Sequence, residues 1–239
     1  MTAAFNIDAS KHDLKDRILQ NVPDVNLDMC LTCGACTGGC PATGIMDMDP
    51  RKVLRMLVLG LEDELRDHPW IWICTMCARC SFVCPMKINF PKIIYNLRQS
   101  WPMDNRPKGI RGSCELHVKA GNAMGVPKDD FIWTVEDVAE EIREEQPEFK
   151  DLQVTVDRVG AFMAVNQNSR EPVTEPEELA PMWKILHMVG ADWTYPSVMW
   201  AGENYCMFLG DDDGWRIILE KFVDHIDNTL GCQQVVNTE

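Results

Sequence analysis

Eight cysteines, arranged in two copies of one spacing, constrain this chain more than any other feature of its sequence. The first copy runs from Cys30 to Pro41 and the second from Cys74 to Pro85, and both read C-x₂-C-x₂-C-x₃-C-P. Three thiols at intervals of three residues can be presented by one short loop, and the proline fixes φ where the chain leaves. This spacing is typical of cubane iron–sulfur sites. The sequence therefore predicts two [4Fe–4S] clusters.

The two copies also predict which cysteines share a cluster. In proteins with two such runs, the fourth cysteine of each run ligates the other cluster. The expected ligand sets are Cys30, Cys33, Cys36 and Cys84 for the first cluster, and Cys74, Cys77, Cys80 and Cys40 for the second. Gly34, Gly38 and Gly39 would allow the backbone to approach the sulfurs. A zinc-stabilised interaction module is the weaker alternative, because structural zinc sites use separated C-x₂-C pairs.

The remaining composition limits the compartment and the partners. Of eleven cysteines, the two motifs leave only Cys114, Cys206 and Cys232, and the start of the chain does not resemble a signal peptide. We therefore expect a cytoplasmic protein whose other thiols are free. A net charge of −14 argues against binding nucleic acid. No apolar run approaches the roughly 18 residues of a membrane span, so direct membrane insertion is not expected.

Helix signals surround the two motifs. Asp49 and Pro50 predict a helix start, and the apolar stripe that follows runs to about Arg66, with acidic residues 62–64 as a solvated face. Residues 70–73 read as apolar core, and Asn89 predicts the start of another helix that extends to Trp101. Helices in these places predict an α-helical two-cluster ferredoxin domain, which we assign to residues 1–148.

The second half of the chain has a different pattern. Thr134 and Asp137 suggest a capping box for a helix that ends near Gln146. Short strands are then expected at 152–156, 161–165, 192–195 and 233–237, with helices at 177–189 and from Gly214, the latter capped by residues 211–213. Alternating strands and helices predict a small parallel α/β segment, residues 149–239. Its helices do not cover both faces of the sheet, so we expect a partner subunit to complete it or dock on it.

Motifs for other chemistry are missing from the sequence. It contains no glycine-rich dinucleotide fingerprint, no P-loop and no Ser–His arrangement. Cys206 lies between a strand and a helix, where a lone cysteine is usually a small buried hydrophobe. Two hypotheses remain: an electron-transfer subunit that is not catalytic alone, and a self-contained iron–sulfur oxidoreductase with catalysis at Cys206 or at a site-differentiated cluster.

The paired motifs on a helical scaffold resemble the C subunit of heterodisulfide reductases. They also resemble the iron–sulfur domain of succinate dehydrogenase and fumarate reductase, which begins with a two-iron domain that this chain lacks. Residues 184–194, 203–205 and 231–239 are similar to the first part of a cysteine-rich CCG domain. That domain occurs in the D subunit of heterodisulfide reductase and in the K subunit of the sulfite-reductase-associated membrane complex.

The sequence departs from the CCG pattern in two places. It has no Cys-Cys-Gly triplet, with Met199-Trp200-Ala201-Gly202 in that neighbourhood, and it ends at Glu239 where family members continue. The resemblance therefore implies a split arrangement, in which this chain relays electrons to or from a separate heterodisulfide-reductase-B-like CCG subunit. A flavin-containing A-like subunit is a second implied partner. The implied setting is thiol, disulfide or sulfur metabolism, in particular a sulfur-oxidising heterodisulfide-reductase-like complex.

Overall fold

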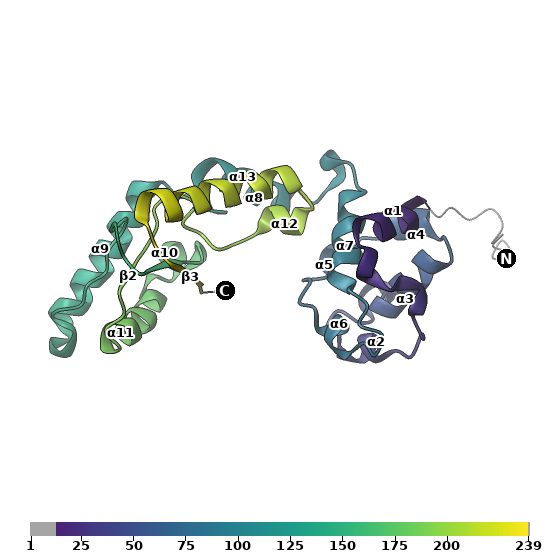
Figure 1. The fold of residues 1–239 in the computed structure, drawn as a ribbon, viewed down its shortest axis with the longest axis horizontal. Coiled ribbons are helices and arrows are strands. Elements are labelled where there is room, and N and C mark those ends of the chain that lie inside the picture. Colours follow the sequence, from purple (N-terminus) through teal and green to yellow (C-terminus); the bar gives the residue numbers. More distant parts are fainter. Residues whose placement is uncertain (1–12, 239) are drawn as a thin grey trace. The chain divides into compact units, whose positions relative to one another are not determined.

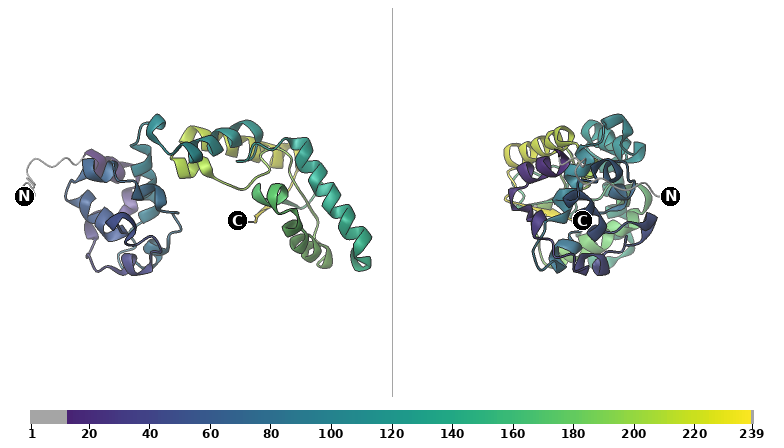
Figure 2. Two further views of the ribbon diagram at one scale, coloured as in Figure 1. Left: turned by 180° about the vertical axis from the view of Figure 1, so that it is seen from behind. Right: turned by 90° about the vertical axis from the view of Figure 1, so that its right-hand side faces the viewer.

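The computed structural model describes residues 13–238, which form two compact units. The first unit contains the chain up to Pro107 together with Phe208–Gly210, and the second contains Lys108–Met207 and the residues from Asp211 onward. The ribbon is drawn in Figure 1 and from two other directions in Figure 2. Each unit has its own apolar core, so each is described by itself.

The first unit is helical throughout its described residues, as the sequence predicts. Its helices are α1 (Asp13–Asn21), η2 (Pro23–Val25), η3 (Leu27–Met29), α2 (Ala35–Gly39), η4 (Ile45–Asp47), α3 (Pro50–Val58), α4 (Glu62–Arg66), α5 (Trp70–Ile73), α6 (Arg79–Val83), α7 (Phe90–Gln99) and η5 (Met103–Asn105).

The helices that follow the two motifs begin in the same way. The Asp49 carboxylate accepts a hydrogen bond from the Lys52 backbone N–H at 3.0 Å, and the Asn89 side chain accepts one from Lys92 at 3.3 Å. Both predicted caps are confirmed. The two halves of the unit thus repeat one plan, in which a cysteine run leads into a capped helix (α3 or α7) whose apolar face is buried.

The helix predicted to run to Arg66 is interrupted. Gly60 adopts a φ of +70°, and the Leu61 N–H donates to the Met56 carbonyl, which closes α3 in a Schellman turn. The prediction that residues 62–64 form a solvated face is also wrong at one position. Glu62 is buried, and its carboxylate accepts hydrogen bonds from the N–H groups of Leu14 (2.8 Å) and Lys15 (3.0 Å) in the first turn of α1. Glu62 thus provides acceptors for two N–H groups at the start of the described part of α1.

The apolar core of the first unit lies beside the cysteine motifs. Trp70 and Ile71 are fully buried, which confirms residues 70–73 as core, and the Trp70 indole donates to the Ala42 carbonyl at 2.9 Å. Trp70 also meets Phe90 edge-on, with ring centroids 6.4 Å apart. The Trp70–Ala42 hydrogen bond thus connects the end of the first cysteine run, at Pro41, with the helix that leads into the second run.

The second unit combines helices with a small sheet. Its elements are α8 (Lys108–Ala120), α9 (Lys128–Glu145), η6 (Pro147–Phe149), β1 (Met163–Asn166), α10 (Arg170–Thr174), η7 (Pro176–Leu179), α11 (Ala180–Met188), β2 (Trp193–Thr194), α12 (Tyr205–Leu209, whose last two residues belong to the first unit), α13 (Asp212–Asp224), the π-helical turn η8 (His225–Leu230) and β3 (Gln234–Asn237).

The sheet is parallel, as predicted, with strand order β2-β1-β3. Met163 pairs with Trp193 on one side and with Gln234 on the other. The strand expected at 152–156 is wrong: only Val156 forms an isolated bridge, to Tyr195. All four residues of β3 are exposed, so this edge strand has little cover among the described residues.

The boundary between the units lies at Pro107, not after residue 148. The reason is α9, whose buried face, formed by Phe131, Val135, Ala139 and Ile142, packs into the core of the second unit. In that core Phe131 stacks on Trp200 with ring centroids 4.1 Å apart. The capping box at Thr134 is also wrong, because α9 begins at Lys128 and the Thr134 hydroxyl donates to the Asp130 carbonyl inside the helix.

Two of the three cysteines outside the motifs form a disulfide. Cys114 in α8 is bonded to Cys206 in α12, across 92 residues of sequence, and both side chains are buried. The expectation of free thiols is therefore wrong for this pair and holds for Cys232. Among residues 13–238, no helix is long and apolar enough to cross a membrane.

The role of Glu62 can be tested by Glu62→Ala in the cluster-loaded chain. Two N–H groups of α1 would lose their acceptor, and we expect a loss of about 1–3 kcal/mol in the free energy of unfolding, measured by urea titration. Glu64→Ala removes an exposed carboxylate from the same helix and should change stability by less than about 0.5 kcal/mol. Equal effects of the two substitutions would contradict this role.

The disulfide should stabilise the second unit by restricting its unfolded chain. For a loop of this length the chain-entropy model gives at most about 4–5 kcal/mol. We expect a reductant to lower the urea midpoint of the wild-type chain, and to leave the midpoint of the Cys114→Ala/Cys206→Ala variant unchanged. A wild-type midpoint that does not respond to full reduction, verified by thiol alkylation, would refute the prediction.

Candidate metal centres

The two cysteine runs follow the same backbone path. In each run the first cysteine follows a short helix, the third lies inside α2 or α6, and the fourth caps the end of that helix. Left-handed φ values recur at matching positions: Thr32 (56°) and Gly34 (81°) in the first run, Met76 (54°) and Ala78 (62°) in the second. The loop conformation is thus set by the spacing of the cysteines, and it is kept even where alanine replaces glycine. Of Gly34, Gly38 and Gly39, the glycines expected to let the backbone approach the sulfurs, only Gly34 has a positive φ.

Each run lines a cavity, and the fourth cysteine of each run lines the cavity of the other. The first cavity is bordered by Cys30, Cys33, Cys36, Cys80 and Cys84, and the second by Cys40, Cys74, Cys77 and Cys80. The exchange is possible because α2 and α6 lie side by side (Figure 1). The two cavities gather the eight cysteines of the runs into two groups, and Cys80 lines both.

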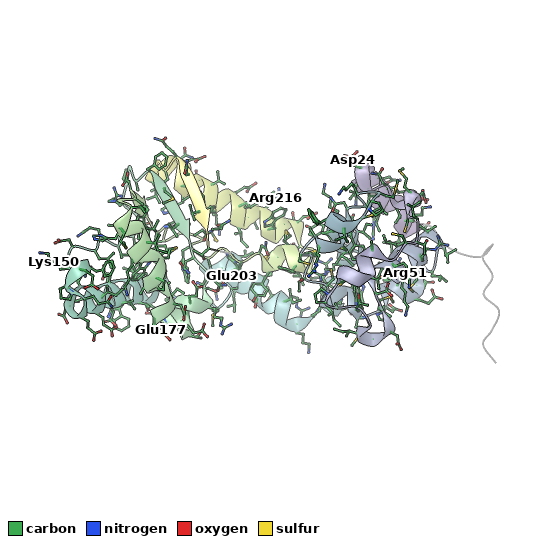
Figure 3. All side chains as sticks on the ribbon, turned by 90° about the horizontal axis from the view of Figure 1, so that it is seen from below. Asp24, Arg51, Lys150, Glu177, Glu203 and Arg216 are labelled. Carbon is green, nitrogen blue, oxygen red and sulfur yellow. A yellow bond between two sulfur atoms is a disulfide. The ribbon has the colours of Figure 1, made fainter. Side chains whose placement is uncertain are left out.

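The surroundings of the two cavities are apolar, with one arginine at each rim. Leu54, Ile88 and Phe90 line the first cavity, and Arg51, labelled in Figure 3, borders it. Arg79 borders the second cavity and is exposed. Such walls exclude water from a bound group while leaving its rim accessible.

Burial affects the chemistry of the thiols. It raises the pKa of Cys36, Cys74 and Cys80, in the last case to about 12. Without metal these side chains are therefore neutral thiols at pH 7, and binding iron must displace their protons. The Met76 backbone N–H donates to the Cys74 sulfur at 3.4 Å, the kind of contact that stabilises a coordinated thiolate. Cavities lined by at least four cysteines each fit [4Fe–4S] clusters, which are held by cysteine thiolates.

Arg98, in the last turn of α7, is a residue at this site that sequence reasoning missed. Its side chain is fully buried, and Nε and Nη2 donate to the Ile71 carbonyl at 2.9 and 2.7 Å. Nη2 also donates to the Cys74 carbonyl and Nη1 to that of Phe208 at 2.9 Å. The guanidinium lies 5.2 Å from the centre of the Trp72 ring. Its position in an apolar helix face was the only signal in the sequence.

Arg98 and Cys74 influence each other electrostatically. Burial lowers the pKa of Arg98 to about 10, and the Cys74 sulfur opposes that shift, so the guanidinium is charged at neutral pH. In turn, the guanidinium partly offsets the rise that burial imposes on the pKa of Cys74.

Cys206 has no free thiol in this structure. It is fully buried and bonded to Cys114, and the Asp211 carboxylate lies 3.6 Å from the Cys114 sulfur. Asp211 also accepts a hydrogen bond from the Gly214 N–H at 3.1 Å, which confirms the predicted cap of α13. A nucleophilic role for Cys206 would require prior reduction and opening of this unit.

Comparison with known proteins agrees with the geometry. Residues 26–88 match the family model of the 4Fe-4S dicluster domain. Together with the two all-thiol cavities, this match assigns two [4Fe–4S] clusters to the chain.

Curated relatives extend the similarity beyond that domain. The iron-sulfur C subunit 2 of CoB–CoM heterodisulfide reductase from Methanocaldococcus jannaschii is 39% identical over 92 residues, which are 38% of this chain and 46% of the relative. A protein of Archaeoglobus profundus that is named as similar to the C subunit of heterodisulfide reductase is 30% identical over 91 residues, 36% of this chain and 48% of the relative.

A longer match is found with the C subunit of the ferredoxin:CoB-CoM heterodisulfide reductase of Methanosarcina mazei. It is 30% identical over 121 residues, which are 49% of this chain and 73% of the relative. For the first relatives, in contrast, the chain spans half of their length or less.

Proposed function

We propose that this chain, which belongs to the family of heterodisulfide reductase C subunits, is an electron-transfer subunit that relays electrons through two [4Fe–4S] clusters and is not catalytic alone. The observation that carries the proposal is the lining of each cavity by cysteines from both runs. Four thiolates give every iron corner of a cubane a protein ligand, which leaves no open position for a substrate. Such a site favours electron transfer over chemistry on a bound molecule.

The ligand sets are part of the proposal. We assign Cys30, Cys33, Cys36 and Cys84 to the first cluster, and Cys74, Cys77, Cys80 and Cys40 to the second. The shared cavity linings and the side-by-side packing of α2 and α6 support this exchange.

The protein's contribution to the relay is to hold the charge of the clusters in a stable environment. Each cluster takes up and releases one electron when bound. The buried Phe90 lines both cavities, and the Met76 N–H donates to the Cys74 sulfur, which stabilises its charge. Because these groups need not move when the charge changes, the scaffold favours rapid transfer.

We further propose that the partner is a B-like subunit of CCG type, with a flavin-containing A-like subunit as a second partner, in a heterodisulfide-reductase-like complex of thiol, disulfide or sulfur metabolism. The names of the relatives, which are C subunits of heterodisulfide reductases, support a partner of this kind. The second unit would be the half-CCG segment; its parallel sheet and the exposed residues of β3 support a surface that another chain covers.

The self-contained enzyme is the alternative function, and it can be separated from the relay by assaying the isolated chain. Anaerobically purified protein should contain about eight irons, two cubanes' worth, and transfer electrons to dyes without turning over a disulfide. The same chain should support disulfide turnover after a CCG subunit is added. Turnover by the isolated chain would overthrow the relay.

The exchange of the fourth cysteine predicts which cluster each substitution damages. Cys84→Ala should alter the electron paramagnetic resonance signal that Cys33→Ala also alters, and Cys40→Ala should match Cys77→Ala, with iron falling from about eight to between about four and seven per chain. If Cys84→Ala instead matches Cys77→Ala, each run holds its own cluster and the assignment is wrong.

A further inference from the structure

Arg98 is a buried charge with no buried carboxylate paired to it in the part of the chain that the structure describes. Charged side chains are almost never fully buried unless they are paired. All of the Arg98 hydrogen bonds described above end on carbonyl oxygens, and no carboxylate forms an ion pair with it among residues 13–238. The guanidinium donates a hydrogen bond to the carbonyl of Cys74, a ligand of the second cluster in the assignment above. The missing counter-charge is therefore on the cluster side.

The buried charge of Arg98 is present in only one half of the internal repeat. When the two halves are aligned on their helix caps, Asp49 and Asn89, Arg98 corresponds to Val58 of α3. Val58 is apolar and packs on the core of the unit. Each cavity also has one arginine at its border, the half-buried Arg51 at the first and the exposed Arg79 at the second. A buried positive charge thus lies beside the second motif and has no equivalent beside the first.

We propose that Arg98 is the counter-charge of the second cluster and raises its reduction potential above that of the first. This inference rests on the proposed ligand sets. A cubane with four thiolates is anionic, and its negative charge increases by one when it takes up one electron from the donor. A fixed cation in a low-dielectric site stabilises the reduced form more than the oxidised form. No proton is exchanged at Arg98, which stays charged in both states.

A purely structural role would give a different result. The guanidinium could serve only to satisfy the carbonyl oxygens of Ile71, Cys74 and Phe208, and a neutral amide would then replace part of that function. Charge and shape are separated by two substitutions: Arg98→Gln keeps N–H donors without the charge, and Arg98→Lys keeps the charge without the planar fork.

The experiment is a redox titration of the full chain, followed by electron paramagnetic resonance at low temperature. The two transitions are assigned with Cys33→Ala and Cys77→Ala, each of which disturbs one cluster. The wild-type chain should show the second cluster reduced first. Arg98→Gln should weaken reduction of the second cluster at least tenfold, a shift of about 59 mV for one electron, while the first cluster changes less than threefold.

Two controls test the cause of that shift. Arg98→Lys should leave the second cluster's reduction equilibrium within about threefold of wild type, because the charge is retained. Arg79→Gln removes an exposed arginine from the rim of the same cavity, and solvent screening should keep its effect within about threefold as well. The proposal is overturned if Arg98→Gln and Arg98→Lys shift the potential equally, if Arg79→Gln shifts it as much, or if the first cluster responds instead.

Iron analysis keeps the test decisive if a variant fails to bind its second cluster. If Arg98→Gln loses the second cluster, so that iron falls from about eight to about four, and Arg98→Lys retains both, the need for the positive charge is established by the loss. If both variants lose it, Arg98 is structural and the proposal fails. The electron-relay function is tested separately, because wild-type iron content and dye reduction do not depend on these variants.

Discussion

Each cavity is lined by cysteines from both halves of an internal repeat, and the rest of the first unit is arranged around that exchange. For Cys40 and Cys84 to reach across, the short helices that precede them must lie side by side. The caps at Asp49 and Asn89 then direct the chain into two longer helices whose buried faces form the core. The arrangement of these helices thus serves to place the cysteine sulfurs around the two cavities.

The repeat is similar in its backbone but different in its electrostatics. Matching left-handed turns give both runs the same path, whereas the buried guanidinium of Arg98 has an apolar counterpart in Val58. A pair of clusters in identical surroundings would have no built-in order of reduction. One buried charge is enough to supply that order, because low-dielectric surroundings do not screen it.

The second unit shows where local patterns in the sequence were insufficient. The helix containing Thr134 and the strand expected at 152–156 were misread, because tertiary contacts decided both. The apolar stripe of α9 faces the aromatic core of Trp183 and Trp200, so the helix extends back to Lys128 and belongs to this unit. In segment 152–156 only Val156 forms a bridge, to Tyr195, and the neighbouring Thr155 carbonyl accepts a hydrogen bond from the Tyr195 N–H.

By itself, the sequence determined the number and spacing of the cysteines in the two runs and the helix starts at Asp49 and Asn89. These are covalent or local properties, set by residues within a few positions of one another. The tertiary structure decided which cavity each fourth cysteine lines, the pairing of Cys114 with Cys206, and the burial of Arg98 beneath Cys74. Each of these depends on residues far apart in sequence that meet only when the cores form, and no local pattern encodes such a meeting.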